Sequence, residues 1–358
     1  MLAMAAGLAA VLASCSADAP AKRPATPTPD DEAVQRAVAA ARRLHARALA
    51  LSRANPKLAS ICRAAAADHA AHLIALGAAP EVSPSPSGSV AATTPPPRSA
   101  ATQLAGEWSA AREALRDAIG AGSAGLAALL SRIAAARAVH ADLIAALLGR
   151  RRLPSLIPAA AIPSRSPFGT ASPSGTASPS PTPPSTALIT LEATPTGTPT
   201  PPDTPWLKAL DRLLAGEHAA VFAYPLVIAQ LTGHPRDRAE ALWLEHQGSR
   251  NELTEVLVQA HAVPVAAEPA YQVTRPGSPA AARALAAAVE LGLTGLAADA
   301  IAVASGARPR AFAAGRLVIG ARRAASWSGR SIALPGLAST PSRSNTPAAP
   351  GVPSRTSP

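Results

Sequence analysis

Aromatic side chains are scarce in this chain of 358 residues, in which Phe, Trp and Tyr together make up only 3%. A hydrophobic core must therefore be built from Ala, Leu, Val and Ile. Small residues of this kind pack closely spaced helices and make poor strands. This composition excludes an aromatic-rich β-sandwich and favours an all-α fold.

Cysteine is almost absent as well: the chain has only Cys15 and Cys62. Two cysteines cannot make the disulfide framework of a small secreted domain. If Cys15 is lipidated, as argued below, Cys62 has no partner for an internal disulfide. It lies on an apolar helical stripe, so we interpret it as a small buried hydrophobic residue.

Acidic residues are fewer than basic ones, with 22 Asp and Glu against 33 Lys and Arg, and the formal net charge is +11. Nucleic acid is nevertheless not an expected partner, because no basic run alternates with aromatics and no zinc-finger spacing occurs. The tight basic cluster at 150–152 is interpreted as the end of a helix. We interpret the other arginines as solvated helix faces, with attraction to anionic lipids or wall polymers as the alternative.

Motifs for known chemistry are missing too. The sequence contains no Gly-x-Ser-x-Gly elbow, phosphate-binding loop, dinucleotide fingerprint or zinc-protease motif. These absences favour a non-enzymatic protein over an enzyme.

Long apolar runs are also lacking, and the run from Leu2 to Ala13 is too short to cross a bilayer. Its length suits the central region of a signal peptide. The run ends in Leu12-Ala13-Ser14-Cys15, which resembles the lipobox of bacterial lipoproteins, although no Lys or Arg precedes it. The resemblance implies cleavage before Cys15, lipidation of its thiol, and anchoring at the extracytoplasmic face of the cell membrane.

Segments rich in Pro, Ser and Thr divide the chain. Such segments bury too little apolar surface to offset the entropy of ordering. We therefore expect a signal peptide at 1–15, a tether at 16–30, a disordered linker at 151–204 that could carry O-glycans, and a disordered tail at 331–358. Helical regions remain at 31–150 and 205–330.

Both helical regions have the same order: two helices joined by a short turn, a long connection, and two more helices joined by a short turn. This order is typical of four-helix bundles with one long crossover, as in ferritin-like proteins. The pattern predicts two such bundles and an internal duplication. The expected helices span about 31–54, 57–76, 101–119, 124–149, 205–232, 235–261, 280–304 and 309–329.

Ionisable residues interrupt the apolar stripes of several of these helices. In the second region the interruptions are Glu217, His246 and Glu290, and in the first they are His69, His72 and His140. The stripe around His140 keeps a spacing of three and four residues. It consists of Leu126, Leu129, Ile133, Ala136, His140, Leu143 and Leu147.

The stretch from Leu213 to Tyr224, with its Glu217-His218-Ala219-Ala220 centre, resembles the opening helix of a ferritin-like domain family. That family has no known function and occurs in lipoproteins of high-GC bacteria. The resemblance covers about 205–328, and the segments around His69 and His140 resemble the helical half that precedes it in such proteins. In di-iron members of the superfamily, two helices each give one carboxylate and two give Glu-x-x-His. Here Glu217 and Glu290 match the lone carboxylates, but no Glu-x-x-His is present.

Because the hard ligands for two irons are missing, no cofactor is expected. We interpret Glu217, His246 and Glu290 as a buried hydrogen-bonded network that fixes the bundle register, with arginines of the last helix as further members. The alternative is one bound metal ion, iron or another divalent metal, there or at His69, His72 and His140.

These patterns predict an envelope lipoprotein that binds a small ligand or an envelope protein of unknown identity. The alternatives are a degenerate metal-binding, oxidoreductase or iron-storage module, and a passive scaffold at the cell wall.

Overall fold

The computed structural model describes residues 26–79, 99–156 and 204–337. Within these ranges the chain forms eight α-helices and no strand. The expected signal peptide with Cys15, most of the tether and of the linker, and the tail beyond 337 lie outside the described residues. The predicted all-α class and the division into two helical halves are confirmed.

The first half consists of α1 (Pro29–Ala54), α2 (Ala59–Ala75), α3 (Ala100–Gly120) and α4 (Ala124–Leu147). Side-chain caps fix three of the four starts. Thr28 and Asp31 form a reciprocal capping box at α1, and Ser99 and Ser123 cap α3 and α4. Helix α1 packs on α2 and α3, and α4 packs on α3 and α2. This ring of contacts is a four-helix bundle with a long connection between α2 and α3.

The second half consists of α5 (Pro205–Ile228), α6 (His234–Gln259), α7 (Pro279–Val303) and α8 (Ala307–Ser328). Thr204 and Ser278 cap α5 and α7 through their hydroxyls. Helix α5 packs on α6 and α7, and α7 packs on α8. By length and composition α7 could also cross a membrane, but half of its most apolar stretch is buried inside the bundle.

Helix α5 ends at Ile228, earlier than the predicted Thr232, and it contains Pro225 in its last turn. A proline has no N–H, so Pro225 cannot bond the carbonyl of Val221 one turn earlier. The indole Nε1–H of Trp243 on α6 donates to that carbonyl instead, at 3.1 Å. A side chain of the neighbouring helix thus replaces the missing backbone bond.

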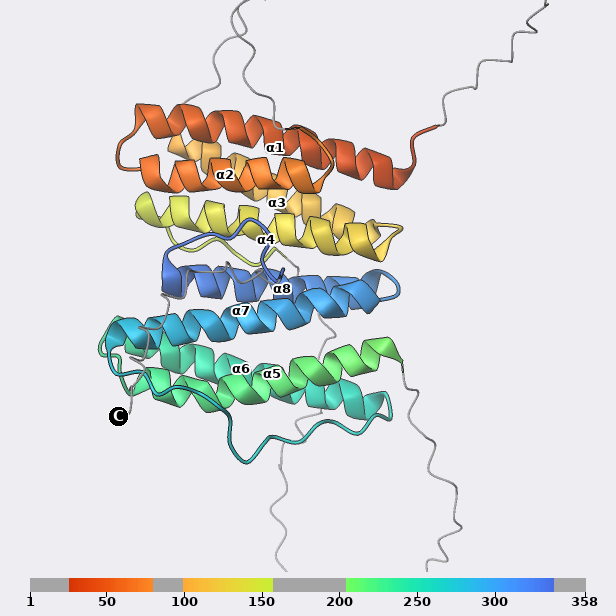
Figure 1. Ribbon diagram of the computed structural model, residues 1–358, viewed down its shortest axis with the longest axis vertical. Coiled ribbons are helices and arrows are strands. Elements are labelled where there is room, and N and C mark those ends of the chain that lie inside the picture. Colours follow the sequence, from red (N-terminus) through yellow and green to blue (C-terminus); the bar gives the residue numbers. More distant parts are fainter. Residues whose placement is uncertain (1–25, 80–98, 157–203, 338–358) are drawn as a thin grey trace, which may run out of the picture.

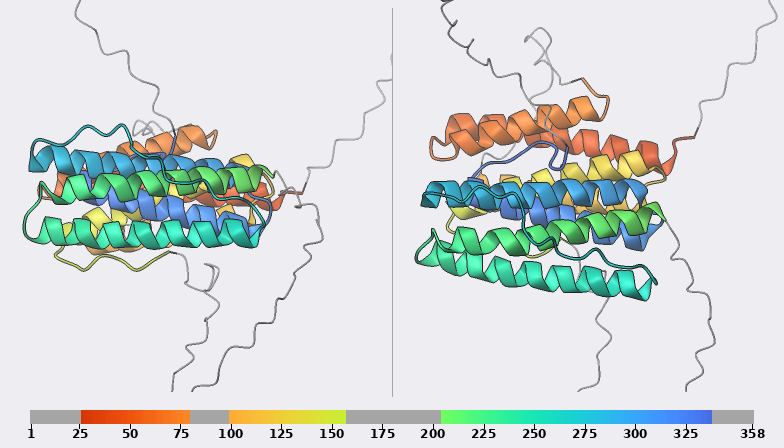
Figure 2. Two further views of the ribbon diagram at one scale, coloured as in Figure 1. Left: turned by 90° about the horizontal axis from the view of Figure 1, so that it is seen from below. Right: turned by 60° about the horizontal axis from the view of Figure 1, so that its bottom comes forward.

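The two halves lie side by side as one stack of helices, with α4 of the first half on α8 and α7 of the second (Figures 1 and 2). One apolar cluster spans the junction and contains Ile133 and Val139 together with Leu317 and Val318. Every residue from 133 to 141 is buried. Helix α4 therefore has no water-facing side over its middle turns.

Polar contacts also join the halves. Arg322 on α8 donates to both carboxylate oxygens of Asp142 on α4. The Nε2–H of His72 donates to the carbonyl of Ala333 at 2.7 Å, and Arg310 donates to the carbonyl of Ala121. The halves are thus fixed to each other by directional bonds as well as by apolar burial.

Burial corrects part of the predicted α4 stripe. Leu147 is 50% exposed, although the stripe placed it in the core, whereas Ala134, Ala135 and Ala138 are fully buried. The second half covers the face of α4 that a lone bundle would turn to water. Cys62 is buried and free, in an apolar cluster between α1 and α2.

Candidate functional sites

A chain of hydrogen bonds crosses the centre of the second half and joins Glu217 on α5, His246 on α6 and Glu290 on α7. Nδ1–H of His246 donates to Oε2 of Glu217 at 2.7 Å, and Nε2–H donates to Oε1 of Glu290 at 3.2 Å. All three side chains are at most 4% exposed. The structure thus brings together the three residues that the sequence singled out.

Two arginines of α8 extend this network, and they lie about two helical turns apart on one face. Arg316 donates to Oε1 of Glu217 at 3.3 Å and also to Glu252 on α6. Arg323 bonds Glu245 and has a terminal nitrogen 4.0 Å from Oε2 of Glu290. Cationic side chains therefore stand where a di-iron centre would need the carboxylate and imidazole of the fourth helix. These residues do not fit two irons.

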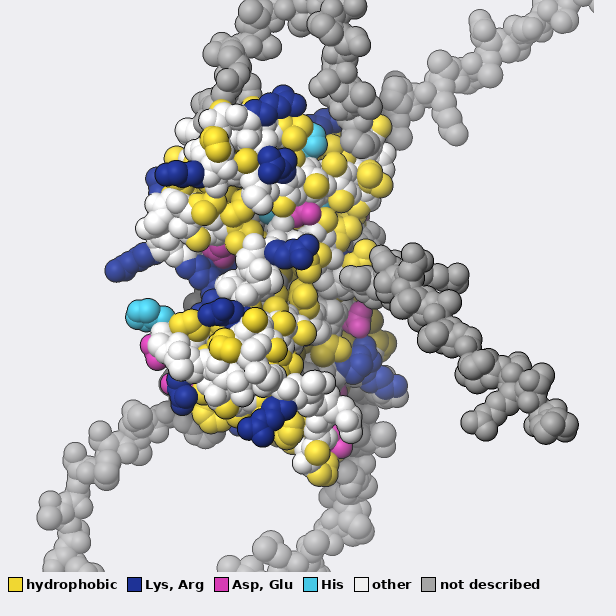
Figure 3. Space-filling model, turned by 60° about the vertical axis from the view of Figure 1, so that its left-hand side comes forward, with side chains coloured by type: hydrophobic (Ala, Val, Ile, Leu, Met, Phe, Trp, Pro, Cys, Tyr) yellow, Lys and Arg dark blue, Asp and Glu magenta, His cyan; other side chains and the backbone are white. Residues whose placement is uncertain are grey.

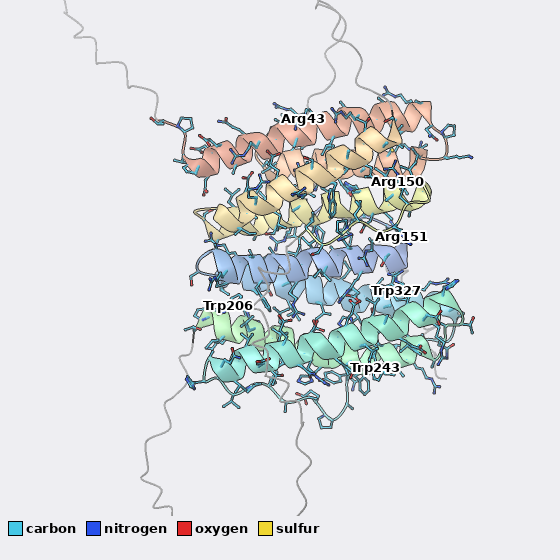
Figure 4. The ribbon with its side chains drawn as sticks, turned by 180° about the vertical axis from the view of Figure 1, so that it is seen from behind. Arg43, Arg150, Arg151, Trp206, Trp243 and Trp327 are labelled. Carbon is cyan, nitrogen blue, oxygen red and sulfur yellow. The ribbon has the colours of Figure 1, made fainter. Side chains whose placement is uncertain are left out.

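Tyr224 and Trp327 complete the network at its far end. The hydroxyl of Tyr224 donates to Oε1 of Glu290 at 2.6 Å and accepts from the indole N–H of Trp327 at 3.3 Å. Trp327 and Trp243 lie toward one end of this half and Trp206 toward the other (Figure 4). The tryptophan of α8 therefore donates a hydrogen bond into the polar centre.

The charges of these groups follow from their neighbours. Burial lowers the pKa of His246, but its hydrogen bonds to Glu217 and Glu290 outweigh burial and raise that pKa to about 9. Burial, reinforced by the charge of Glu290, raises the pKa of Tyr224 above its usual range. At neutral pH the centre therefore holds an imidazolium between two carboxylates.

A cavity of about 160 Å³ opens beside this network. Charged groups from four elements line it, namely Glu217, Glu252, Glu290, Arg316 and Arg323. Leu213, Leu293 and Phe312 supply apolar walls, and Ser155, which follows α4 of the first half, completes the lining. Two buried carboxylate oxygens at this cavity, Oε1 of Glu252 and Oε2 of Glu290, have no hydrogen-bond partner.

A second polar cluster lies at the centre of the first half. Nε2 of His69 on α2 is 2.8 Å from Oε1 of Glu107 on α3, and Nδ1 of His140 on α4 is 3.5 Å from Oε2 of the same carboxylate. The His69 ring lies 5.1 Å from the His140 ring and 5.6 Å from the His72 ring. The three histidines singled out from the sequence are thus neighbours.

The sequence reasoning missed the two carboxylates of this cluster. Glu107 is fully buried, and Asp68 accepts a hydrogen bond from Nε2–H of His140 at 2.8 Å. A signal for Glu107 did exist, because it interrupts an apolar stripe of α3 that includes Leu104, Ala111 and Ala118. His69, Glu107 and His140 could together hold a metal ion, since one ligand atom from each lies within 4.8 Å of the others.

Burial and the shared carboxylate set the charges of the first cluster. Burial lowers the pKa of His69 and takes that of His72 well below its usual range. Burial would also lower the pKa of His140, but the charge of Glu107 and the bond to Asp68 raise it to about 9. Burial would raise the pKa of Glu107, but the charge of His140 and the hydrogen bonds from His69 and His140 outweigh burial and hold that pKa well below its usual range. The cluster therefore has one charged and two neutral histidines at pH 7.

The surface carries no comparable concentration of one charge on the face that Figure 3 presents. Lys and Arg side chains are scattered over it among apolar and uncharged groups. Arg150 and Arg151 follow the C-terminal end of α4, and Arg43 lies on α1 at the opposite side of the first half (Figure 4). This distribution suits solvated helix faces.

Comparison with known proteins matches only the second half to a family. Residues 209–339 are similar to a family described as a domain of unknown function, DUF4439. No curated protein and no solved structure matches the chain. The similarity thus covers all but the first residues of α5 together with α6, α7 and α8, and it comes with no assigned activity.

Proposed function

We propose that this chain is a lipid-anchored envelope protein with ferritin-like bundles, and that its second half binds a small ligand rich in hydrogen-bond donors. The observation that carries the binding role is the cavity beside Glu290, with its two carboxylate oxygens that accept no hydrogen bond. A buried acceptor without a donor costs on the order of 1–3 kcal/mol. A ligand that supplies ammonium or hydroxyl donors removes this penalty.

The charges of the cavity favour a cationic or polyhydroxylic ligand over an anion. Arg316 and Arg323 already bond carboxylates of α5 and α6, so their charges are largely neutralised. The unsatisfied atoms are acceptors, on Glu252 and Glu290.

The test is thermal unfolding of the purified full chain with ethanolamine or glycerol as donor-rich probes and inorganic phosphate as the anionic one. A ligand at about 100 times its Kd stabilises a protein by about 2.7 kcal/mol. We expect a donor-rich probe to raise the Tm of the wild type, and Glu252→Gln to abolish the rise. The matched control is Glu240→Gln, because Glu240 is half-exposed on α6 and does not line the cavity.

Stabilisation by phosphate alone would contradict the ligand class, since it would mean that the arginines are available. No response to any probe, with retention on anionic wall material that salt abolishes, would favour the passive scaffold instead. A Tm rise that persists in Glu252→Gln would place the binding outside this cavity.

The membrane anchor is tested separately at Cys15. We expect cells fed an alkyne-tagged fatty acid to label the wild type and the protein to partition into detergent. Cys15→Ser should lose both properties. Cys62→Ala is the matched control, because Cys62 is buried in the first half, and label that survives Cys15→Ser would contradict the anchor.

A further inference from the structure

Three helices of the first half direct potential metal ligands to one point. The His69, Glu107 and His140 side chains come from α2, α3 and α4, and all three are fully buried. One ligand atom from each lies within 4.8 Å of the other two. Three nitrogen and oxygen ligands around one point are the protein contribution to many zinc sites, which keep a fourth position open.

The cluster does not satisfy its own polar atoms. Oε2 of Glu107 and Nδ1 of His140 face each other at 3.5 Å, and neither has a hydrogen-bond partner. Most buried polar atoms in proteins are hydrogen-bonded, so two unpaired atoms that face each other need an explanation. An ion between them would satisfy both.

The groups around the cluster orient these atoms as metal sites require. Nε2–H of His140 donates to Asp68 at 2.8 Å, so Nδ1 is the ring nitrogen that faces Glu107 and that can coordinate an ion once its proton has left. A carboxylate behind a histidine in this way fixes the ring and its tautomer in metal sites. On the other side, the Gln103 amide donates to Oε1 of Glu107 at 2.8 Å and fixes the carboxylate.

Among the residues that the structure describes, Arg137 is the buried cation that opposes a bound metal in this cluster. Its terminal nitrogens donate to the carbonyls of Ala110 and Ala37, at 3.3 and 3.0 Å. Two carboxylates, Glu107 and Asp68, offset its charge, so the site has a net charge of about −1 once His140 has released its proton to make room for the ion. This sum still favours a dication, whereas the arginines of α8 are directed into the second centre itself.

We propose that the first half binds a single divalent transition-metal ion, of the zinc class, through His69, Glu107 and His140. The ion takes the place of the proton between Nε2 of His69 and Glu107 and of the proton on Nδ1 of His140, and both protons are released to water. Imidazole and carboxylate together suit zinc and cobalt better than calcium or magnesium, which prefer oxygen ligands alone. This centre is distinct from the cavity of the second half.

The test uses the full chain, stripped with a chelator and titrated with Co²⁺, whose visible absorption reports a tetrahedral site. Zn²⁺ then competes with Co²⁺, and elemental analysis counts the bound ions. We expect one ion per chain. Glu107→Gln keeps the shape of the side chain and should weaken binding at least 100-fold, with helicity checked by circular dichroism. Asp68→Asn should weaken it about 10- to 100-fold, as expected for a group behind a metal ligand.

Glu217→Gln is the matched control, because it alters the equivalent centre of the second half and should leave Co²⁺ binding unchanged. Absence of a tetrahedral Co²⁺ spectrum in the wild type would overturn the proposal. Binding that survives Glu107→Gln, or that Glu217→Gln removes, would overturn it as well. Ligand binding in the second half does not enter any of these measurements.

Discussion

The guanidinium of Arg322 on α8 donates two hydrogen bonds to the carboxylate of Asp142 on α4, at 2.7 and 2.9 Å. Arg322 also donates to the carbonyls of Leu153 and Pro154. It is 5% exposed, so water does little to screen the pair. This residue pair fixes the position of one half against the other.

Arg322→Ala should therefore destabilise the whole chain strongly. Removal of one partner of a buried ion pair leaves the other charge unpaired and costs about 3–5 kcal/mol. Urea unfolding followed by circular dichroism measures the loss. Arg236→Ala is the control, because the Arg236–Glu240 pair is exposed and should change stability by less than about 1 kcal/mol. Equal effects of the two substitutions would show that the Arg322 contact is as weak as a surface pair.

His246→Gln should destabilise the protein in a pH-dependent way. The folded pKa of His246, about 9, lies above the ordinary 6.5, so its charged form contributes stability that is complete below about pH 6.5. This contribution is lost as the pH rises through about 9. We expect the Tm difference between wild type and variant to be largest at pH 6 and to shrink toward pH 9.5. A difference that stays constant over this range would mean that His246 is neutral in the folded protein.

Gly320→Ala should force α7 and α8 apart. A Cβ at this position would lie 2.6 Å from Oγ1 of Thr294, and that hydroxyl is already bonded to the backbone carbonyl of Glu290. Overpacking of this kind costs about 1–3 kcal/mol. Gly248→Ala is the control: it is an exposed helical glycine with open space around it, and the change should stabilise α6 by about 0.5–1 kcal/mol. Chemical denaturation measures the change in the free energy of unfolding for both variants. A change of the same sign in the two would show that the close contact at Gly320 is wrong.

Tyr224→Phe removes a hydroxyl that serves two neighbours at once. The variant leaves the indole N–H of Trp327 without its acceptor and Glu290 without a donor. We expect a loss of about 1–3 kcal/mol in the free energy of unfolding. Tyr271→Phe removes a hydroxyl from a connection at the surface, where it accepts only from Glu268, and should cost less than about 0.5 kcal/mol. An unchanged free energy of unfolding in Tyr224→Phe would show that water replaces the hydroxyl.

The sequence predicted the second polar centre better than the first. Glu217 and His246 stand out because large apolar residues such as Leu210, Leu214 and Leu253 flank them at helical spacing. Glu107 occupies an equivalent position, but its neighbours on the stripe are mainly alanines, whose small side chains mark a buried face only weakly. The contrast that reveals a buried carboxylate was therefore weak in α3.

Contact between the halves could not be read from periodicity, because each stripe was judged as the one buried face of a separate bundle. Helix α4 is buried all round from 133 to 141, and that stretch is mostly alanine. Alanine gives no signal of a second apolar face, since it is also the best residue for an exposed helix. The large apolar residues alone defined the predicted stripe, so Leu147 was placed in the core, although it is 50% exposed.

The burial of α4 from both sides has a consequence for how the molecule comes apart. A fragment cut in the linker would leave the alanine surface of α4, or the matching surface of α8, facing water. Each fragment would then expose apolar surface that is buried in the intact chain, and each would be prone to self-association. Heating the intact chain should accordingly produce a single cooperative melting transition, in which both halves lose their structure together.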